Sequence, residues 1–273
     1  MVDINQGHDH VLVIGNGFDL NLGLKTKYQD FIQSAYFRDL IRPNSIFSHL
    51  DERNNLNRWV DIEIEFKKYS IEVNDTEFEA DYYKLCDGLA KYINNIDYSI
   101  IDKASPAFDL VKNILGKDFV VFDFNYTNTF YKTGEILHYD LNDLENRIFN
   151  VHGSANEANI IFGVEDKAVI KQEHIFLKKS FPSYFKAIGL NNCLRNSKEI
   201  YFFGHSLGET DHTYFSNFFP YISNIEIPQN LRTIYLYYYS QSAYKDLHIQ
   251  LDVLTHKTIM GLKQLNSFKP IKV

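Results

Sequence analysis

The first strong pattern in the chain is an unbroken apolar run that ends in glycine. Residues 11–15 read VLVIG, without the polar alternation of a strand that faces water on one side. Such a run predicts a β-strand buried on both faces, as in a parallel sheet. The run is followed by the glycine turn GNG and then by helix-compatible sequence. A strand, a turn and a helix in this order form the opening unit of an α/β fold.

The next part of the chain has a helical periodicity. Between residues 26 and 105 apolar residues recur at spacings of three and four, and no segment has the pattern of a strand. A stretch of this length is long for a simple crossover between two strands. We therefore expect a helical insertion at 26–105, a lid or subdomain, between the first and second strands.

Strand patterns return in the second half and alternate with helical ones. Helical patterns occupy 171–194, 211–222 and 242–255, the last as the closing helix. Strands are predicted at 118–125, 147–153, 159–163, 199–204 and 231–240. This alternation predicts a Rossmann-like, mostly parallel sheet built from residues 1–25 and 106–273. The pattern does not reveal the order of the strands.

Composition and charge narrow the class of protein. The 273 residues are 45% hydrophobic, enough for a full core, and the net charge of −7 argues against a duplex nucleic-acid partner. Cys86 and Cys193 stand far apart, so we expect no disulfide framework and no metal site. The chain has no signal core and no apolar run near the roughly 18 residues of a membrane span, so we expect a cytoplasmic protein.

Small and polar residues follow four of the predicted strands. The carboxyl ends of parallel strands meet at one edge of a sheet, and ligands bind in the crevice there. We therefore expect one ligand to contact residues of four groups: Gly15, Asn16, Gly17 and Asp19; Asn125, Tyr126 and Thr127; His152 and Gly153; Gly204, His205, Ser206 and Asp211.

The turn after the first strand leaves several roles open. Its glycines would let backbone N–H groups approach an anion, although the third glycine of GxGxxG is absent and the turn could also be a tight turn only. Asp19 would repel a phosphate beside it. It is expected to cap the following helix, to accept a hydrogen bond from a sugar hydroxyl, or to orient His152.

Five segments in this order resemble the AbiH-type bacteriophage abortive-infection family: GNGFDL, NRWVDIEIEF, FDFNYTNTF, VHGS and FFGHSLGETD. The resemblance spans nearly the whole chain. It implies a bacterial anti-phage protein that harms or arrests the infected cell, with a phage protein as a candidate trigger. The resemblance does not itself supply a chemistry.

A more distant resemblance, to sirtuin-like NAD-binding and NAD-consuming domains, covers the strand ends. GNGFD is similar to their glycine turn, with Asp19 in place of a serine, and FNYT is similar to the segment around their asparagine, with Thr127 in place of an acid. The His-Gly pair at 152–153 and the GHS at 204–206 match two further motifs. The resemblance implies NAD or a related nucleotide as ligand or substrate, and a small-molecule hydrolase.

The same resemblance implies the roles of single residues. Asn125 and His152 become the catalytic candidates, because an asparagine can hold a water or the ribose and a histidine of pKa near 6.5 can accept a proton. The remaining strand-end residues are expected to contact the nucleotide: Gly15, Asn16, Gly17, Asp19, Thr127, Gly204, Ser206 and Asp211.

Two other functions fit the sequence. Residues 204–208 form a complete GxSxG, so Ser206 is the nucleophile of a serine hydrolase in one alternative, with Asp246 or Asp252 and His256 as partners. In the other, the protein is a non-catalytic sensor or scaffold, in which the sheet holds a ligand and the insertion recognises a phage product. A homo-oligomer is compatible with each of these functions.

The insertion also carries the acidic segment WVDIEIE. On a helix Asp61 and Glu65 share a face, while Glu63 points elsewhere. We expect a solvent-exposed acidic face with Trp59 in the core. The alternative, from the family resemblance, is that this helix lines the cleft.

Overall fold

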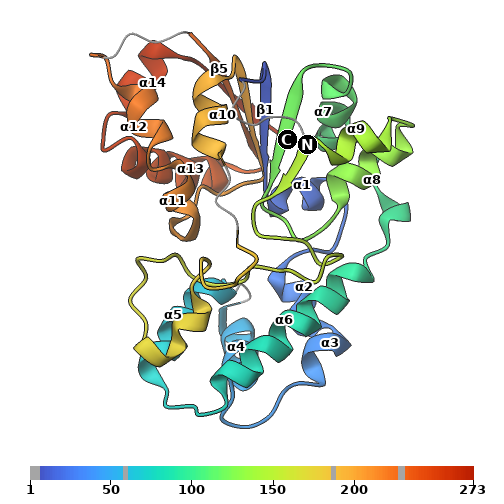
Figure 1. Cartoon of the computed structure of the whole chain (residues 1–273), viewed down its shortest axis with the longest axis vertical. Coiled ribbons are helices and arrows are strands. Elements are labelled where there is room, and N and C mark those ends of the chain that lie inside the picture. Colours follow the sequence, from blue (N-terminus) through green and yellow to red (C-terminus); the bar gives the residue numbers. More distant parts are fainter. Residues whose placement is uncertain (1–6, 58–60, 186–188, 227–230) are drawn as a thin grey trace. The chain divides into compact units, whose positions relative to one another are not determined.

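A computed structural model gives the structure of the chain and describes residues 7–57, 61–185, 189–226 and 231–273 (Figure 1). The chain forms two compact units. The first, here called the sheet unit, comprises Met1–Leu24, Tyr98–Val151 and Ala187–Val273, and the second, the helical unit, comprises Lys25–Asp97 and His152–Lys186. The helical unit thus combines most of the expected insertion with residues 152–186, which the sequence analysis places in the sheet domain.

The sheet unit contains a six-stranded sheet in which every pairing is parallel. The predicted α/β, Rossmann-like fold is therefore confirmed. The strands lie in the order β3-β2-β1-β4-β5-β6. Their bounds are β1 (His10–Ile14), β2 (Phe119–Asp123), β3 (Ile148–Asn150), β4 (Glu199–Phe203), β5 (Thr233–Tyr238) and β6 (Ser267–Lys272).

The centre of the sheet is β1, which lies between β2 and β4. Ile14, at the carboxyl end of β1, pairs with Asp123 of β2 and with Phe203 of β4. The carboxyl ends of these three strands therefore lie at one level. The chain order reverses between β1 and β4, and this reversal is the switch point at which open α/β sheets form their ligand crevice.

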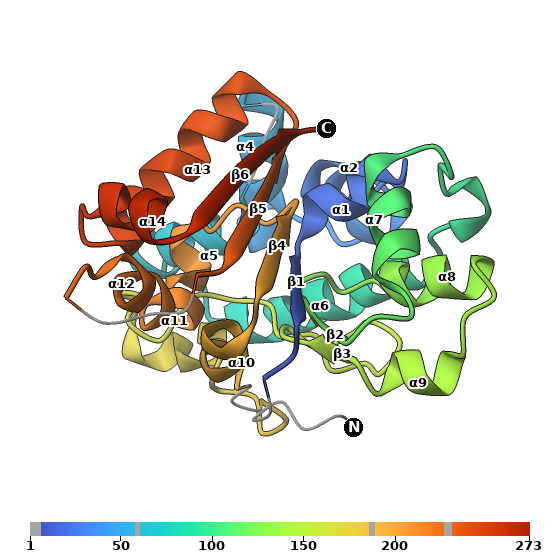
Figure 2. The same cartoon turned by 90° about the horizontal axis from the view of Figure 1, so that it is seen from above.

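The helices of the sheet unit follow from the same alternation of patterns. They are α1 (Asn16–Asn21), η1 (Tyr98–Ile100), α7 (Pro106–Ile114), α8 (Thr129–Ile136), α9 (Leu141–Glu145), α10 (Leu190–Asn196), η3 (Glu209–Asp211), α11 (His212–Phe215), α12 (Phe218–Ser223), α13 (Gln241–Leu254) and α14 (Ile259–Leu265). Figure 2 shows α10 to α14 on one side of the sheet and α1, α7 and α8 on the other.

Both faces of the central strands are packed. On one face Val13, Phe202 and Leu236 are at most 1% exposed and belong to a cluster that includes side chains of α10 to α14. On the other face Phe18 of α1 packs edge to face on Phe203, with ring centroids 5.6 Å apart. This cover on both faces explains the unbroken apolar run at residues 11–15.

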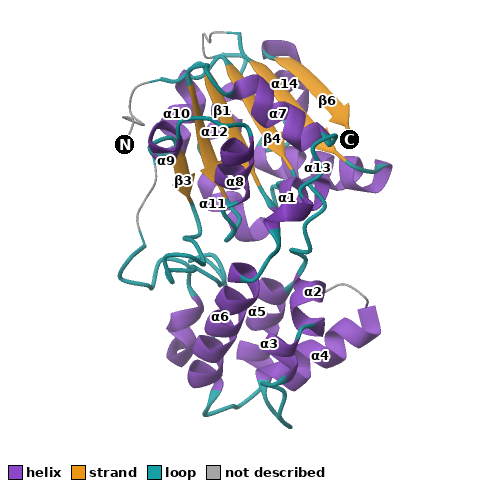
Figure 3. Ribbon diagram, turned by 90° about the vertical axis from the view of Figure 1, so that its right-hand side faces the viewer, coloured by secondary structure: helices purple, strands orange, loops and turns teal. Residues whose placement is uncertain are grey.

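The helical unit consists of helices and loops in its described part (Figure 3). Its helices are α2 (Tyr28–Gln33), α3 (Ala35–Arg38), α4 (Ile46–Asn57), α5 (Ile62–Glu72), α6 (Phe78–Asn94) and η2 (Gln172–Leu177). The segment 171–194, expected to be helical, forms η2 and the start of α10, with turns and irregular chain in the described residues between them. Among all described residues, none of the helices combines the length and the apolar character needed to cross a bilayer.

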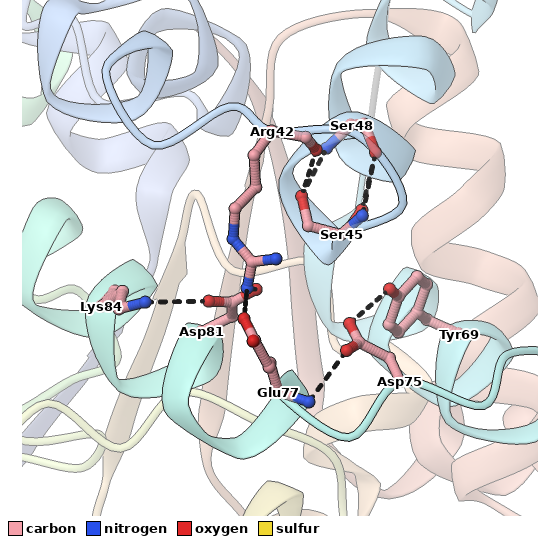
Figure 4. A network of polar contacts seen from close by, with 8 residues as sticks. All are labelled: Arg42, Ser45, Ser48, Tyr69, Asp75, Glu77, Asp81 and Lys84. Carbon is pink, nitrogen blue, oxygen red and sulfur yellow. Dashed lines mark hydrogen bonds and ion pairs between the residues drawn. The ribbon is translucent and has the colours of Figure 1, made fainter.

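A buried ion network stabilises one end of α6 (Figure 4). Asp81 is fully buried and pairs with the Arg42 guanidinium and, at 3.3 Å, with Lys84 Nζ. The same Arg42 nitrogen lies 2.7 Å from Glu77 Oε2. The Asp81 carboxylate can be buried here because each of its oxygens meets a cation.

The acidic segment of α5 is not the exposed face that the sequence predicts. Glu63 and Glu65 are each only 6% exposed. Glu63 pairs with the buried Lys179 at 3.0 Å, and Glu65 accepts a hydrogen bond from His49 at 2.9 Å. The expectation of a solvated face is wrong because neighbouring cations compensate the buried carboxylates. Trp59 lies outside the described residues.

The strand predicted at 159–163 is also wrong. These residues have no strand and belong to a loop of the helical unit. Phe162 packs on Phe66 with ring centroids 5.1 Å apart, and its carbonyl accepts a hydrogen bond from Tyr82 at 2.6 Å. Burial in an aromatic core produced the apolar pattern that the sequence analysis takes for a strand.

The sequence analysis misses β6 and takes 242–255 as the closing helix. In the structure α13 is followed by α14 and β6. The sequence of β6, SFKPIK, contains a proline and two lysines. An edge strand tolerates these residues because only one of its sides forms ladder hydrogen bonds, here with β5.

Candidate functional site

The glycines after β1 and β4 let two turns approach each other closely. A Cβ on Gly17 would lie 2.6 Å from Gly204 Cα, and one on Gly15 would lie 2.8 Å from His205 Cα. Gly204 itself has φ of +68°, in the left-handed region that favours glycine. The GNG turn and the GHS turn are therefore packed backbone against backbone at the switch point of the sheet.

The backbone donors of this turn are used within the protein. Gly15 N–H donates to Phe203 O at 3.1 Å, and Gly17 N–H donates to Gly204 O at 3.0 Å. The expectation that these two groups face a bound anion is therefore wrong. Asn16, between them, is exposed.

Asp19 is fully buried and links α1 to the turn after β2. Its carboxylate accepts a hydrogen bond from Thr127 Oγ1 at 2.7 Å and another from Asn125 Nδ2 at 3.2 Å. Thr129 Oγ1 donates in turn to Thr127 Oγ1 at 3.0 Å. The N-cap of α1 is Gly15, so the expectation that Asp19 caps this helix is wrong.

The environment of Asp19 favours its protonated form more than water does. Burial raises the pKa of Asp19 to about 7, although hydrogen bonds from Thr127, Thr129 and Asn125 favour the charged form and oppose the rise. Asp123, the last residue of β2, is also buried, and burial together with the nearby Asp19 charge raises its pKa well above the ordinary value. The site thus holds two buried carboxyl groups whose protonated forms are favoured.

Asn125 is held at both its main chain and its side chain. Its N–H donates to Asp123 Oδ1 at 2.8 Å, and its side-chain NH2 donates to Asp19. Asn125 is 7% exposed, and its side-chain oxygen Oδ1 accepts no hydrogen bond from any described residue. Asn125 therefore has one acceptor atom that no described residue uses.

His205, after β4, is also fixed in one orientation. Leu207 N–H donates to His205 Nδ1 at 3.0 Å, so a neutral ring carries its proton on Nε2. Nε2 lies 3.3 Å from Asp211 Oδ2, and the ring packs on Phe124 with centroids 4.3 Å apart. These contacts indicate that His205 stabilises the loop after β4 and does not act as a general base.

Ser206 does not have the surroundings of a catalytic nucleophile. Its side chain is exposed, and its Oγ accepts a hydrogen bond from Gly208 N–H at 3.2 Å. A nucleophile elbow places the serine itself in a strained turn, whereas here the left-handed φ of +53° belongs to Leu207. Within the described part of the chain no hydrogen bond joins Ser206 to a histidine, so the structure gives the serine hydrolase alternative no support.

Comparison with known proteins decides the family. The family model described as bacteriophage abortive infection AbiH matches residues 11–98 and 65–230, which together span 220 of the 273 residues (11–230). The chain is a member of the AbiH family. No curated protein matches its sequence. Membership supports a role of this AbiH protein in phage abortive infection, and the matched range includes every residue of the site described above.

The second catalytic candidate of this AbiH protein, His152, lies in the helical unit. It is 4% exposed, and its carbonyl accepts a hydrogen bond from Ile161 N–H at 2.8 Å. The next residue, Gly153, has φ of +72°, and a Cβ there would lie 2.0 Å from Asn159 O. The His-Gly pair therefore forms a tight turn of the helical unit, whereas Asn125 belongs to the sheet unit.

Three residues of the polar network around Asp19 and Asn125 were not predicted from the sequence. Asp123 ends an otherwise apolar strand, and this acid at the end of FVVFD was the signal that could have revealed it. Thr129 follows Thr127 by two residues, and this spacing matches no motif that would have marked it as a site residue. Tyr98, whose hydroxyl accepts a hydrogen bond from Asn128 N–H at 3.2 Å, comes from a different part of the sequence.

No group of three or more histidine, cysteine, aspartate or glutamate side chains in the described parts of the chain is arranged to hold a metal ion.

Proposed function

We propose that this AbiH protein acts in abortive infection by binding a ribose-containing nucleotide, NAD or a close relative, at the carboxyl ends of β1, β2 and β4, and by hydrolysing it. The observation that carries the proposal is the side-chain oxygen of Asn125, a residue that is 7% exposed: this oxygen accepts no hydrogen bond from the described residues. An amide oxygen that has no donor within the protein can accept a hydrogen bond from a bound ligand.

The location supports the same proposal. Asp19, Asn125 and Thr127 follow β1 and β2, and Gly204 to Asp211 follow β4, beside the switch point between β1 and β4. Ligands of sheets with this strand order bind at such a point. Because Gly15 and Gly17 N–H groups are used internally, the proposal relies on side chains such as Ser206 and Asn16 for the phosphates.

The residues supply groups that the reaction needs. Hydrolysis of NAD breaks the bond from the anomeric carbon to the nicotinamide nitrogen, and the bonding electrons leave with nicotinamide. The oxygen of a water forms the new bond to carbon, and one proton must be accepted. In the proposed reaction Asn125 binds the water or a ribose hydroxyl, and the proton is released to solvent water.

Calorimetry with NAD, ADP-ribose and ATP, and chromatography of released nicotinamide, test the proposal on the full chain. We expect binding of at least one of the three, weakened about tenfold in Asn125→Ala by the loss of one hydrogen bond. Asp109→Asn, an exposed acid of α7, is the matched control and should bind as the wild type does. Failure of the folded protein to bind any of the three ligands overturns the proposal.

One observation favours a sensor without turnover as the second candidate. The two catalytic candidates, Asn125 and His152, belong to different units. Binding at the strand ends needs the sheet unit alone, and the proton acceptor expected from the sequence, His152, is not part of that unit. Nucleotide binding without release of nicotinamide would favour the sensor over the hydrolase.

A further inference from the structure

We propose that Asp19 is a positioning residue: it orients the side-chain amide of Asn125 so that the amide oxygen meets the ligand, and the site thereby selects a hydrogen-bond donor, a ribose hydroxyl. This inference rests on the proposed nucleotide site. No sequence motif predicts this preference for a donor, because it depends on the orientation of the Asn125 side-chain amide.

The orientation follows from the chemistry of the neighbours. An amide can present either an oxygen acceptor or an NH2 donor, whereas an ionised carboxylate only accepts. Asp19 Oδ1 lies 3.2 Å from Asn125 Nδ2, so the ionised carboxylate holds the NH2 group toward itself. The other carboxylate oxygen accepts from Thr127 Oγ1 at 2.7 Å, which fixes the carboxylate plane from a second direction.

The backbone of Asn125 is fixed by the second carboxyl group of the site. Its N–H donates to Asp123 Oδ1 at 2.8 Å. With the main chain bound to Asp123 and the NH2 bound to Asp19, only Oδ1 remains for the ligand. Asp19 therefore acts through Asn125, and we do not assign it a contact with the ligand.

The free acceptor restricts what can bind beside it. Phosphate and carboxylate oxygens only accept hydrogen bonds at neutral pH, so neither pairs with an amide oxygen. A hydroxyl group donates readily. At the end of β2 we therefore place the sugar of the nucleotide, and we exclude its phosphates from this position.

A double-mutant cycle tests whether Asp19 acts through Asn125. An amide at position 19 can donate to the Asn125 oxygen, so Asp19→Asn lets the Asn125 amide turn its NH2 toward the ligand. We expect Asp19→Asn to weaken NAD binding about tenfold in the wild-type background and to have little further effect in Asn125→Ala. Additive losses would overturn the positioning role, and Asp109→Asn serves as the acid-to-amide control.

A second measurement uses the wild-type protein and no nucleotide. The pKa of Asp19 is raised by burial to about 7, so the 15N and 1H signals of the Asn125 side-chain amide should titrate near pH 7. The charge of Asp19 in turn raises the pKa of two neighbouring titratable groups, Asp123 and Tyr98. Asp123→Asn should leave the Asn125 signal titrating, and Asp19→Asn should abolish the change.

The two measurements separate the two proposals. A folded protein that binds none of the nucleotides, yet shows the titration of the Asn125 amide, would overturn the nucleotide function and keep the positioning role. An Asn125 side-chain amide signal that is the same in Asp19→Asn as in the wild-type protein would overturn the positioning role even if NAD binds.

Discussion

At the scale of single residues, Asp19 sets the pH dependence of stability. Its pKa is 3.8 in an unfolded chain and about 7 in the folded protein. Between these values the folded protein holds a proton that the unfolded chain has released. The free energy of unfolding should therefore fall as the pH rises through this window and level off above it, by at most about 4 kcal/mol.

Urea unfolding at about pH 5 and about pH 8 measures this effect. Asp19→Asn carries no proton to titrate, so its stability should fall less between the two pH values than that of the wild type. Asp123 has a raised pKa as well and should leave part of the fall in the variant. Equal falls in the wild type and in Asp19→Asn would contradict the assignment, and Asp109→Asn should follow the wild type.

Gly204 tests the close approach of the two turns. An alanine there would adopt φ of +68° and place its Cβ 2.2 Å from Phe18 N. Gly116 is the matched control, because it has φ of +87° but nothing lies within 4 Å of a Cβ. Gly116→Ala should cost about 1–2 kcal/mol from backbone strain, and Gly204→Ala at least about 1 kcal/mol more from the clash.

The measurement is the free energy of unfolding of both variants in urea. Similar losses for Gly204→Ala and Gly116→Ala would show that the turns separate at little cost, and would leave the positive φ of Gly204 as the reason for glycine after β4.

At the scale of elements, the sequence predicts every strand of the sheet except the edge strand β6. The runs at β1, β2 and β4 are buried on both faces and carry no competing signal. The edge strand β6 shares its composition with loops, and the apolar segment 159–163 is buried without being a strand. Apolar pattern reports burial, and burial coincides with strand structure only inside the sheet.

The candidate site was also predicted only in part from the sequence. The rule that ligands meet strand ends brings together Asp19, Asn125 and Thr127, which the structure joins by hydrogen bonds. The sequence could not show that the N–H groups of Gly15 and Gly17 are used internally, because their acceptors lie nearly 190 residues away in the chain. It also could not assign His152 to the other unit, since that depends on packing between distant segments.

At the scale of the whole molecule, the helical unit depends on its second segment. Tyr82 donates to Phe162 O at 2.6 Å, and Glu63 pairs with Lys179 at 3.0 Å. A chain of residues 25–97 alone would lose these partners and expose its aromatic core. We expect it to lack fixed tertiary packing, and residues 25–97 joined by a linker to 152–186 to regain it.

Near-ultraviolet circular dichroism and the dispersion of amide NMR signals distinguish the two chains. Cooperative unfolding of 25–97 alone would contradict the view that the unit is built from both segments.

The pairing of β1 with β4 has a consequence for synthesis. Ile14 pairs with Phe203, which follows it by 189 residues (203 − 14), so the first strand emerges from the ribosome long before this neighbour exists. At about 5–20 residues per second the delay is on the order of 10–40 s. A chain whose translation stops before residue 199 therefore has a β1 without its neighbour β4, and the switch point of the sheet forms only in the last quarter of synthesis.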